Sequence, residues 1–195
     1  DEPPTIPDSL LTRDEQLAKA RALLAEAGFG PDNPLSFTLT FRNASDRRIV
    51  IVALQDMWRQ IGVDVKLQGQ EVKVAYNSFR SGDFEAGDAG WVADYSDPDN
   101  FLFLVLTSSG QMNYGNYSNP KFDNLMAQAS QMTDLAERAE TLAAAERIIL
   151  ADLPLIPIYF GVNRNLVGPH VEGWVDNPVS IHRTRFLRLN ESKRS

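Results

Sequence analysis

The acidic segment Asp94-Tyr95-Ser96-Asp97-Pro98-Asp99-Asn100 has the clearest potential for chemistry in this sequence. Carboxylates in such a turn can bind a metal ion or an ammonium group, or can bond to their own backbone. A calcium loop beginning at Asp94 would need Gly at its sixth position and Glu at its twelfth. Those positions hold Asp99 and Val105, so the spacing does not match a calcium loop. The residues alone leave an ammonium site and plain turn chemistry open.

Residues for metal or nucleophilic chemistry are scarce elsewhere. The chain has no cysteine, and its two histidines, His170 and His182, lie far from any carboxylate cluster in the sequence. A zinc site is therefore not expected. The serines of Ser108-Ser109-Gly110 lack the flanking glycine of a nucleophile elbow. We expect no metal, no cofactor, no catalytic residue and no enzymatic activity.

Composition and charge narrow the class of protein. The 195 residues, 43% of them hydrophobic, suffice for one well-buried core, or one core and a tail. The net charge of −7 argues against binding to nucleic acid, which requires a basic surface, and against docking onto anionic lipid. Residues 181–195 carry a local charge of +4, so the rest of the chain carries −11. No apolar run approaches membrane-spanning length.

Two strands and the helix between them must position the acidic segment. Apolar and polar residues alternate over 35–41 and again over 63–67, which predicts two strands. Between them, an apolar stripe with helical spacing runs from about Asp46 to Gly62. A strand–helix–strand unit with short connections predicts that the two strands are parallel, with a right-handed crossover.

Start and stop signals predict the remaining elements. Thr12 and Glu15 form a capping-box pattern, and Gly82 is placed to end a helix over about 72–79. Two further helices are predicted after Asn119 and after Asp134. A short strand running into Gly90-Trp91 and a strand over 155–160 complete the pattern. The predicted fold class is α/β, with a partly parallel sheet flanked by helices.

Seven short motifs in order resemble a known family, and they cover roughly residues 10–175. The motifs are Lys19-Ala20-Arg21-Ala22-Leu23-Leu24-Ala25-Glu26-Ala27-Gly28-Phe29, Leu54-Gln55-Asp56-Met57-Trp58-Arg59-Gln60-Ile61-Gly62-Val63, Gly90-Trp91-Val92-Ala93-Asp94-Tyr95 with Gly82-Asp83-Phe84-Glu85 ahead of it, Asp97-Pro98-Asp99-Asn100-Phe101, Asn116-Tyr117-Ser118-Asn119-Pro120, Phe122-Asp123, and Pro154-Leu155-Ile156-Pro157-Ile158-Tyr159 with Arg138 ahead of it. With these motifs the chain resembles the carboxy-terminal lobe of the family 5 extracellular solute-binding proteins, the oligopeptide- and dipeptide-type substrate-binding proteins of ABC transporters.

The resemblance implies a division of the chain and a place in the cell. It implies a linker over 1–11, a periplasmic binding protein-like, ligand-binding lobe over 12–164, and a return segment over 165–195. The return segment would normally pack on an amino-terminal lobe, which this chain lacks along with any signal peptide. A periplasmic or extracytoplasmic location is implied. The implied partners are a peptide or small amine-bearing solute and the permease subunits of an ABC transporter. We expect a monomer and no nucleic acid.

The resemblance also implies which residues bind the solute. In peptide-binding members, the aspartate three residues after the Gly-Trp tryptophan binds the free ammonium group of the peptide, and here that residue is Asp94. Trp91 would form a wall of the pocket. Main-chain groups of Val92 and Ala93 would pair with an extended peptide as an added strand. Some oligopeptide binders carry an arginine where this chain has Asp88, which favours a cationic or shorter ligand here.

Three other functions stay open at this point. One is a binding protein of the same family with a non-peptide ligand such as an opine, a sugar or a metal chelate. A hydrolase is a more remote alternative, which the scarcity of histidine disfavours. The third is an interaction module, for example one that docks onto a chemoreceptor.

Overall fold

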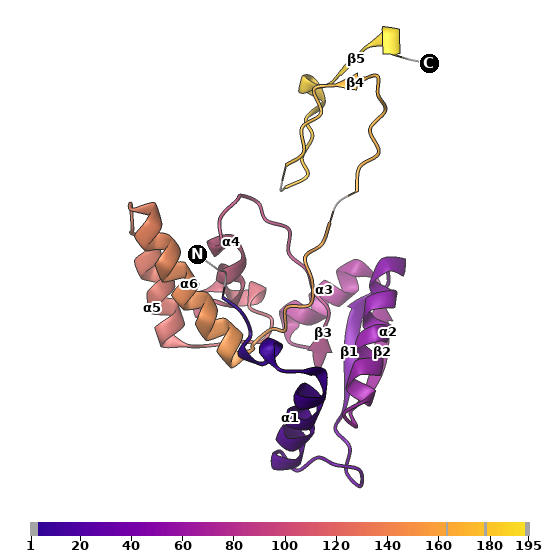
Figure 1. The fold of residues 1–195 in the computed structure, drawn as a ribbon, viewed down its shortest axis with the longest axis vertical. Helices are drawn as coiled ribbons and strands as arrows, with labels where there is room; N and C mark the ends of the chain where they lie inside the picture. Colours follow the sequence, from indigo (N-terminus) through magenta and orange to yellow (C-terminus); the bar gives the residue numbers. More distant parts are fainter. Residues whose placement is uncertain (1–3, 163, 178, 194–195) are drawn as a thin grey trace.

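The computed structural model, which describes residues 4–162, 164–177 and 179–193, contains a three-stranded parallel sheet beside the helix α2, Ser45–Arg59 (Figure 1). The strand order is β2–β1–β3, with β1 at Ser36–Arg42, β2 at Asp64–Gln70 and β3 at Ala86–Gly87. The pairing of β1 with β2 is parallel along its whole length, from Ser36–Asp64 to Arg42–Gln70. The parallel pairing predicted from the sequence is confirmed.

The helix α2, Ser45–Arg59, connects β1 to β2 and covers one face of the sheet. Its Trp58 meets Phe37 edge-on, with ring centroids 5.3 Å apart. Gln55 donates from Nε2 to the carbonyl of Val65 at 2.7 Å, which ties the helix to the sheet. The buried side chains of this first core are Leu39, Phe41, Ile51, Val63 and Val65.

The helix α3, Val72–Ser81, connects β2 to β3 and ends at Gly82, as predicted. Gly82 adopts the left-handed conformation (φ 73°), which glycine tolerates without a steric penalty. β3 begins four residues before Gly90 and pairs with β1 through Leu39–Ala86 and Thr40–Gly87. The predicted strand running into Gly90-Trp91 is therefore wrong in position, because the chain leaves the sheet after Gly87.

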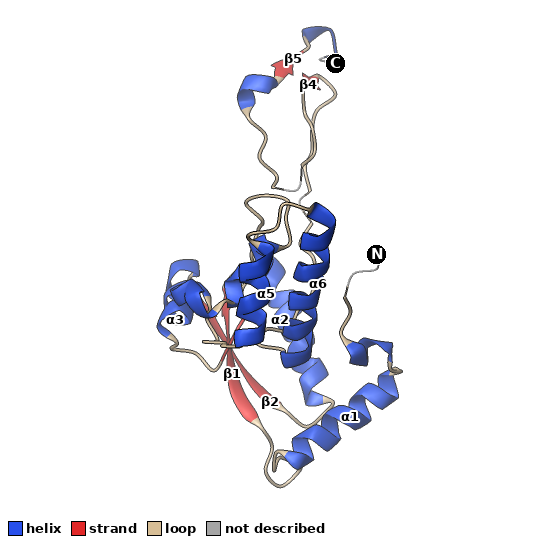
Figure 2. Cartoon of the chain, turned by 90° about the vertical axis from the view of Figure 1, so that its left-hand side faces the viewer, coloured by secondary structure: helices blue, strands red, loops and turns tan. Residues whose placement is uncertain are grey.

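A second core lies between α5, Pro120–Ala129, and α6, Leu135–Asp152, which run side by side in Figure 2. Asn119 and Asp134 cap these helices by accepting hydrogen bonds from backbone N–H groups in the first turn, as their sequence pattern predicts. Short helical turns lead into this core: α4 (Asp99–Leu102), η2 (Phe103–Val105) and η3 (Thr107–Met112). The buried side chains are Leu102, Val105, Phe122, Met126, Ala129, Leu142, Ala145 and Ile149.

The helix α1, Arg13–Glu26, follows a short turn, η1 (Pro7–Leu10), and begins with the capping box predicted from the sequence. Thr12 accepts from the N–H of Glu15, and the Glu15 carboxylate accepts from the N–H of Thr12. None of the residues of α1 is buried, although Leu24 is partly buried against the first core.

The segment after α6 is not the strand predicted over 155–160. Leu153 turns the chain with a positive φ of 50°, and no residue over 153–162 belongs to a strand. Pro154 and Pro157 have no N–H to donate to a neighbouring strand. The apolar side chains of this segment are exposed, among them Ile156, Tyr159 and Phe160.

The carboxy-terminal part extends away from the two cores in both views (Figures 1 and 2). It contains an antiparallel pair, β4 (Val171–Glu172) with β5 (Arg188–Leu189), and two short turns, η4 (Thr184–Phe186) and η5 (Glu191–Lys193). Its large apolar side chains are mostly exposed, namely Leu166, Val175, Ile181, Phe186 and Leu189. Within the described residues, no helix has the length and apolarity needed to span a membrane.

Candidate functional site

The predicted site residues lie just beyond the carboxyl end of the parallel sheet. β3 ends at Gly87, and Asp88 continues alongside β1 by donating its N–H to the carbonyl of Thr40 at 2.8 Å. The chain then runs without regular structure from Asp88 to Ala93. Ligands of parallel α/β sheets generally bind outside the carboxyl ends of the strands. The sheet thus places this segment where a ligand site is expected.

Trp91 is half-buried and fixed by two contacts. Its indole Nε1 donates to Oδ1 of Asn100 at 2.9 Å. Its ring meets that of Phe103 edge-on, with centroids 5.5 Å apart. The ring is therefore anchored on one side, which a rigid pocket wall requires.

Asp94 is exposed, and its carboxylate has no hydrogen bond or ion pair with any described residue. Its backbone N–H donates to Oδ1 of Asn100 at 3.0 Å. The acidic turn is instead stabilised by Asp97, whose Oδ1 accepts from the N–H of Asp99 at 3.0 Å. The turn chemistry predicted as an alternative for Asp94 is thus performed by Asp97.

The two residues between Trp91 and Asp94 leave their main chain available. In the described part of the chain, no hydrogen bond joins a backbone N–H or carbonyl of Val92 or Ala93 to another protein group. Val92 exposes 66% of its surface. Such an unpaired stretch is what an extended peptide needs to add itself as a strand.

The segment from Asp88 to Gly90 lies beside two arginines that sequence reasoning missed. Oδ1 of Asp88 is 4.0 Å from Nη1 of Arg47, and the exposed fractions of the two side chains are 14% and 22%. A Cβ added at Gly90 would lie 3.4 Å from Nη2 of Arg47 and 3.8 Å from Nη2 of Arg42. Both guanidinium groups therefore converge on the backbone of Gly90. Arg42 is the last residue of β1 and Arg47 lies in the first turn of α2. This position was the available signal, because the carboxyl end of a parallel strand is a ligand-binding position.

Arg42 and Arg47 are further held by aromatic rings. The guanidinium of Arg42 lies over the ring of Tyr76 at 5.7 Å, and its Nε is buried with no hydrogen-bond partner among the described residues. Arg47 lies over the ring of Tyr159 at 5.6 Å and donates to its hydroxyl at 2.9 Å. The rings fix both cations without neutralising them.

An ion cluster attaches the acidic turn to α6. Arg138 donates from Nη1 to Oδ2 of Asp97 at 2.5 Å, and its Nη2 is 3.6 Å from Oδ2 of Asp99. The hydrogen bond from Arg138 lowers the pKa of Asp97, whereas burial and the hydrogen bond with Asp97 raise the pKa of Asp99. Arg138 thus fixes the turn that carries Asp94 and Asn100 to the second core.

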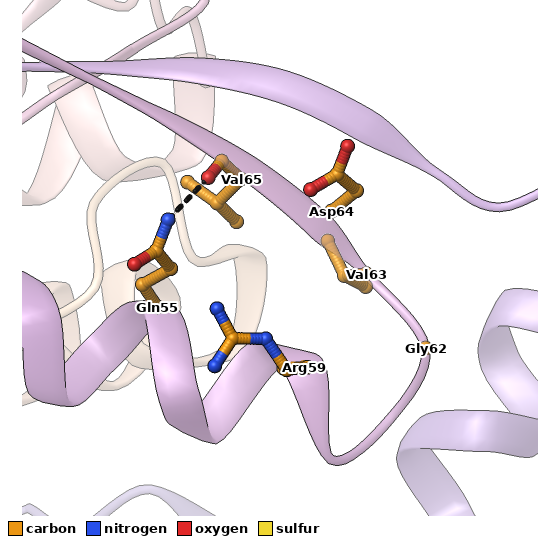
Figure 3. Close-up of a pocket in the computed structure, with 6 residues that line it drawn as sticks. All are labelled: Gln55, Arg59, Gly62, Val63, Asp64 and Val65. Carbon is orange, nitrogen blue, oxygen red and sulfur yellow. Dashed lines mark hydrogen bonds between the residues drawn. The ribbon is translucent and has the colours of Figure 1, made fainter.

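Two hollows elsewhere on the surface are separate from these residues. One, of about 210 Å³, lies where α2 leads into β2 and is lined by Gln55, Arg59 and Val65, among others (Figure 3). It is at the amino end of β2, opposite to the end where Asp88 leaves the sheet. The other, of about 520 Å³, lies between α5 and α6. Among the described residues, no group of three or more histidines and carboxylates is arranged to hold a metal ion.

Comparison with known proteins gives consistent matches. Residues 2–113 match the sequence model of the bacterial extracellular solute-binding proteins, family 5 Middle. The chain is 36% identical over 189 residues to the periplasmic murein peptide-binding protein MppA of Escherichia coli, covering 96% of this chain and 35% of that protein. It is 33% identical over 166 residues to heme-binding protein A of Haemophilus influenzae, covering 82% of this chain and 30% of that protein.

Solved structures agree with the sequence matches. The murein tripeptide binding protein MppA of Escherichia coli superposes with a TM-score of 0.88 at 34% identity, covering 96% of this chain and 37% of that chain. OppA of Haemophilus influenzae, in complex with the peptide RPPGFSPFR, superposes with a TM-score of 0.86 at 33% identity, covering 93% and 36%. The predicted α/β lobe of periplasmic binding protein type is confirmed. The chain spans about a third of the length of these relatives.

Proposed function

Because the chain belongs to the family 5 bacterial extracellular solute-binding proteins, we propose that it forms the carboxy-terminal lobe of a peptide-binding component of an ABC importer. The solute binds in a cleft between this lobe and a second one, and the complex delivers it to permease subunits in the membrane. The protein is periplasmic or extracytoplasmic, acts as a monomer and has no enzymatic activity. The periplasmic relative MppA and the peptide complex of OppA support this proposal.

The exposed carboxylate of Asp94 carries the proposal. A carboxylate on a fixed turn that no described protein group neutralises is suited to a charge-assisted bond with an ammonium group. The half-buried ring of Trp91 supplies apolar contact beside it. The unpaired main chain of Val92 and Ala93 pairs with the peptide backbone irrespective of side chains, which suits a broad range of peptides.

The arginines beside Asp88 complete the site at its other end. The two positive charges of Arg42 and Arg47 and the negative charge of Asp88 leave a net charge of +1 around Gly90. This end of the site therefore attracts an anionic group such as a peptide carboxylate. Gly90 and Asp94 are four residues apart, which is at most about 13 Å of extended chain. This span suits a short peptide that has both termini free, which agrees with the shorter ligand expected from Asp88. A cationic ligand, the other expectation from Asp88, is not favoured at this end because Arg42 and Arg47 leave it positively charged.

The carboxy-terminal part fits the same proposal. Its exposed apolar side chains, such as Leu166 and Phe186, have no cover in the described part of the lobe. We propose that residues 165–195 pack on the amino-terminal lobe of the complete protein, that 12–164 form the ligand-binding lobe and that 1–11 form a linker.

A non-peptide ligand is the second candidate, and one similarity favours it. The heme-binding relative covers most of this chain at 33% identity, so the same lobe architecture serves a metal chelate. A metal chelate such as heme carries carboxylates that Arg42 and Arg47 would bind, but it has no ammonium group for Asp94. Dependence of binding on a free amine therefore distinguishes the two candidates.

Native mass spectrometry of the complete protein purified from cells, followed by calorimetry, tests the proposal. We expect a bound mass that corresponds to a short peptide. We also expect that acetylation of the peptide's amino group weakens binding by about ten- to a hundredfold. This factor is the change in affinity that corresponds to losing one hydrogen bond to a charged group. Equal binding of the acetylated and free peptides would reject the peptide proposal and favour the chelate. Hydrolysis of peptides or esters by the purified protein would instead indicate an enzyme.

A further inference from the structure

Among the described residues, Asn100 is the one whose side chain forms hydrogen bonds with both Trp91 and Asp94. Its Oδ1 accepts from the indole Nε1 of Trp91 at 2.9 Å and from the backbone N–H of Asp94 at 3.0 Å. An amide oxygen has two lone pairs, so these two bonds use its full accepting capacity. One atom therefore sets the position of the ring and of the backbone that carries the carboxylate.

Asn100 is itself fixed by its surroundings. It exposes 2% of its surface, and its backbone N–H donates to the carbonyl of Asp97 at 3.1 Å. Asp97 is in turn bonded to Arg138 of α6. The shared oxygen is therefore attached to the second core through a short, partly buried chain of contacts.

Loss of the shared oxygen would affect the two partners together. The half-buried indole N–H of Trp91 would lose its acceptor, and a polar group left unsatisfied in a buried position is unfavourable. The backbone of Asp94 would lose the bond that fixes the direction of its Cα–Cβ vector. Because Asp94 is exposed, few other contacts would hold its carboxylate in place.

We propose that Asn100 is a positioning residue of the ligand site, which holds the Trp91 ring and the Asp94 carboxylate in the arrangement that binds the ligand's ammonium group. This inference rests on the proposed function and adds to it the residue that determines selectivity for a free amine. Asn100 does not contact the ligand. It acts by keeping the carboxylate at a fixed distance from the pocket wall.

The test compares variants of the complete protein by the loss of affinity that acetylation of a short peptide's amino group causes. We expect Asn100→Ala to bind the free-amine peptide about tenfold more weakly and to reduce the acetylation effect to less than about threefold. Asn100→Asp retains an oxygen in the same position and should retain the acetylation effect. Nuclear magnetic resonance should show faster hydrogen exchange at the Trp91 indole in Asn100→Ala only.

Asn113 provides the matched control, because it is also buried, at 6% exposure. Its side chain bonds the backbone of Leu106 and Tyr117 and makes no contact with Trp91 or Asp94. Asn113→Ala should lower the melting temperature and leave the acetylation effect unchanged.

Each outcome of this comparison is decisive. If Asn100→Ala keeps the full acetylation effect of the wild type, or if Asn113→Ala loses as much of it, the positioning role is rejected and Asn100 is only structural. If acetylation does not weaken binding to the wild type, the proposed binding of a free amine is rejected, whatever the Asn100 variants show.

Discussion

The ring of Phe79 lies so close to Gly87 that a Cβ at that glycine would be 2.6 Å from Cε1 of the ring. Phe79 is 1% exposed and also contacts the rings of Tyr76, Phe84 and Tyr114 edge-on or tilted. The ring therefore has no free space into which to move. Gly87 thus allows α3 to pack closely against β3. The residues of the candidate site, from Asp88 to Asp94, follow directly after this contact.

Replacing Gly87 by alanine should destabilise the protein by about 1–3 kcal/mol, the usual range for overpacking a core. The expected measurement is the free energy of unfolding in urea. Gly30→Ala is the matched control, because no atom lies within 4 Å of its added Cβ and its φ is not in the left-handed region. Equal stability of the two variants would show that Phe79 can move aside.

Asp97→Asn should lower stability at neutral pH by about 1 kcal/mol, within the range of partly exposed ion pairs and charged hydrogen bonds. The hydrogen bond from Arg138 lowers the pKa of Asp97 in the folded protein. Its stabilising contribution is therefore complete above the unfolded pKa, near 4, and is lost as the pH falls through the folded pKa. The difference between wild type and Asp97→Asn should shrink in denaturation experiments below about pH 4.

Asp99→Asn is the control for that prediction. Burial and the contact with Asp97 raise the pKa of Asp99, so its ionised form is disfavoured in the folded protein. Removing this charge should destabilise the protein less at neutral pH than removing the charge of Asp97. The reverse order would contradict the assignment of Asp97 as the main partner of Arg138.

Tyr117→Phe should make the protein less sensitive to alkali. Burial and the hydrogen bond that its hydroxyl donates to Asp152 raise the pKa of Tyr117 to about 12. The wild type therefore has a stabilising contribution that is complete below the ordinary tyrosine pKa, near 10, and is lost as the pH rises toward 12. The difference in melting temperature between wild type and Tyr117→Phe should be smaller at about pH 11 than at about pH 8. An equal difference at the two pH values would reject this contribution.

The strands and helix caps that a local sequence pattern specifies could be predicted from the sequence. The alternation over 35–41 and 63–67 predicted the two strands, whose apolar face buries Leu39, Phe41 and Val65. The short helical connection between them predicted their parallel pairing. The caps at Thr12, Asn119 and Asp134 form as predicted, because a cap needs only residues of its own turn.

Features that depend on distant parts of the chain could not be predicted in the same way. The apolar run over 155–160 has the composition of a strand but no strand beside it, and two prolines limit its pairing. The grouping of Arg42 and Arg47 around Gly90 depends on how β1 and β3 align, which no local pattern specifies. The shared contact of Asn100 with Trp91 likewise depends on the path of the whole turn.

Arg42→Ala should weaken binding of a short peptide with a free carboxylate more than binding of its amide. A guanidinium–carboxylate contact is a charged hydrogen bond worth roughly 1.5–3 kcal/mol, so amidation of the ligand should weaken binding to the wild type by about tenfold or more. The same amidation should have little effect on Arg42→Ala. Arg59→Ala is the control, since Arg59 is an exposed arginine at the far end of α2. An unchanged amidation effect in Arg42→Ala would remove Arg42 from the site.

Asp94→Asn should weaken binding of free-amine ligands to the complete protein by about ten- to a hundredfold. The substitution keeps the shape of the side chain and one acceptor oxygen but removes the charge, and no described residue would lose a partner of this carboxylate. Acetylation of the ligand removes the other half of the same pair. The two changes together should therefore weaken binding little more than either alone, and calorimetry on the four combinations measures their coupling. Additive effects would mean that Asp94 and the ammonium group act independently, and the amine would then have to bind elsewhere in the cleft.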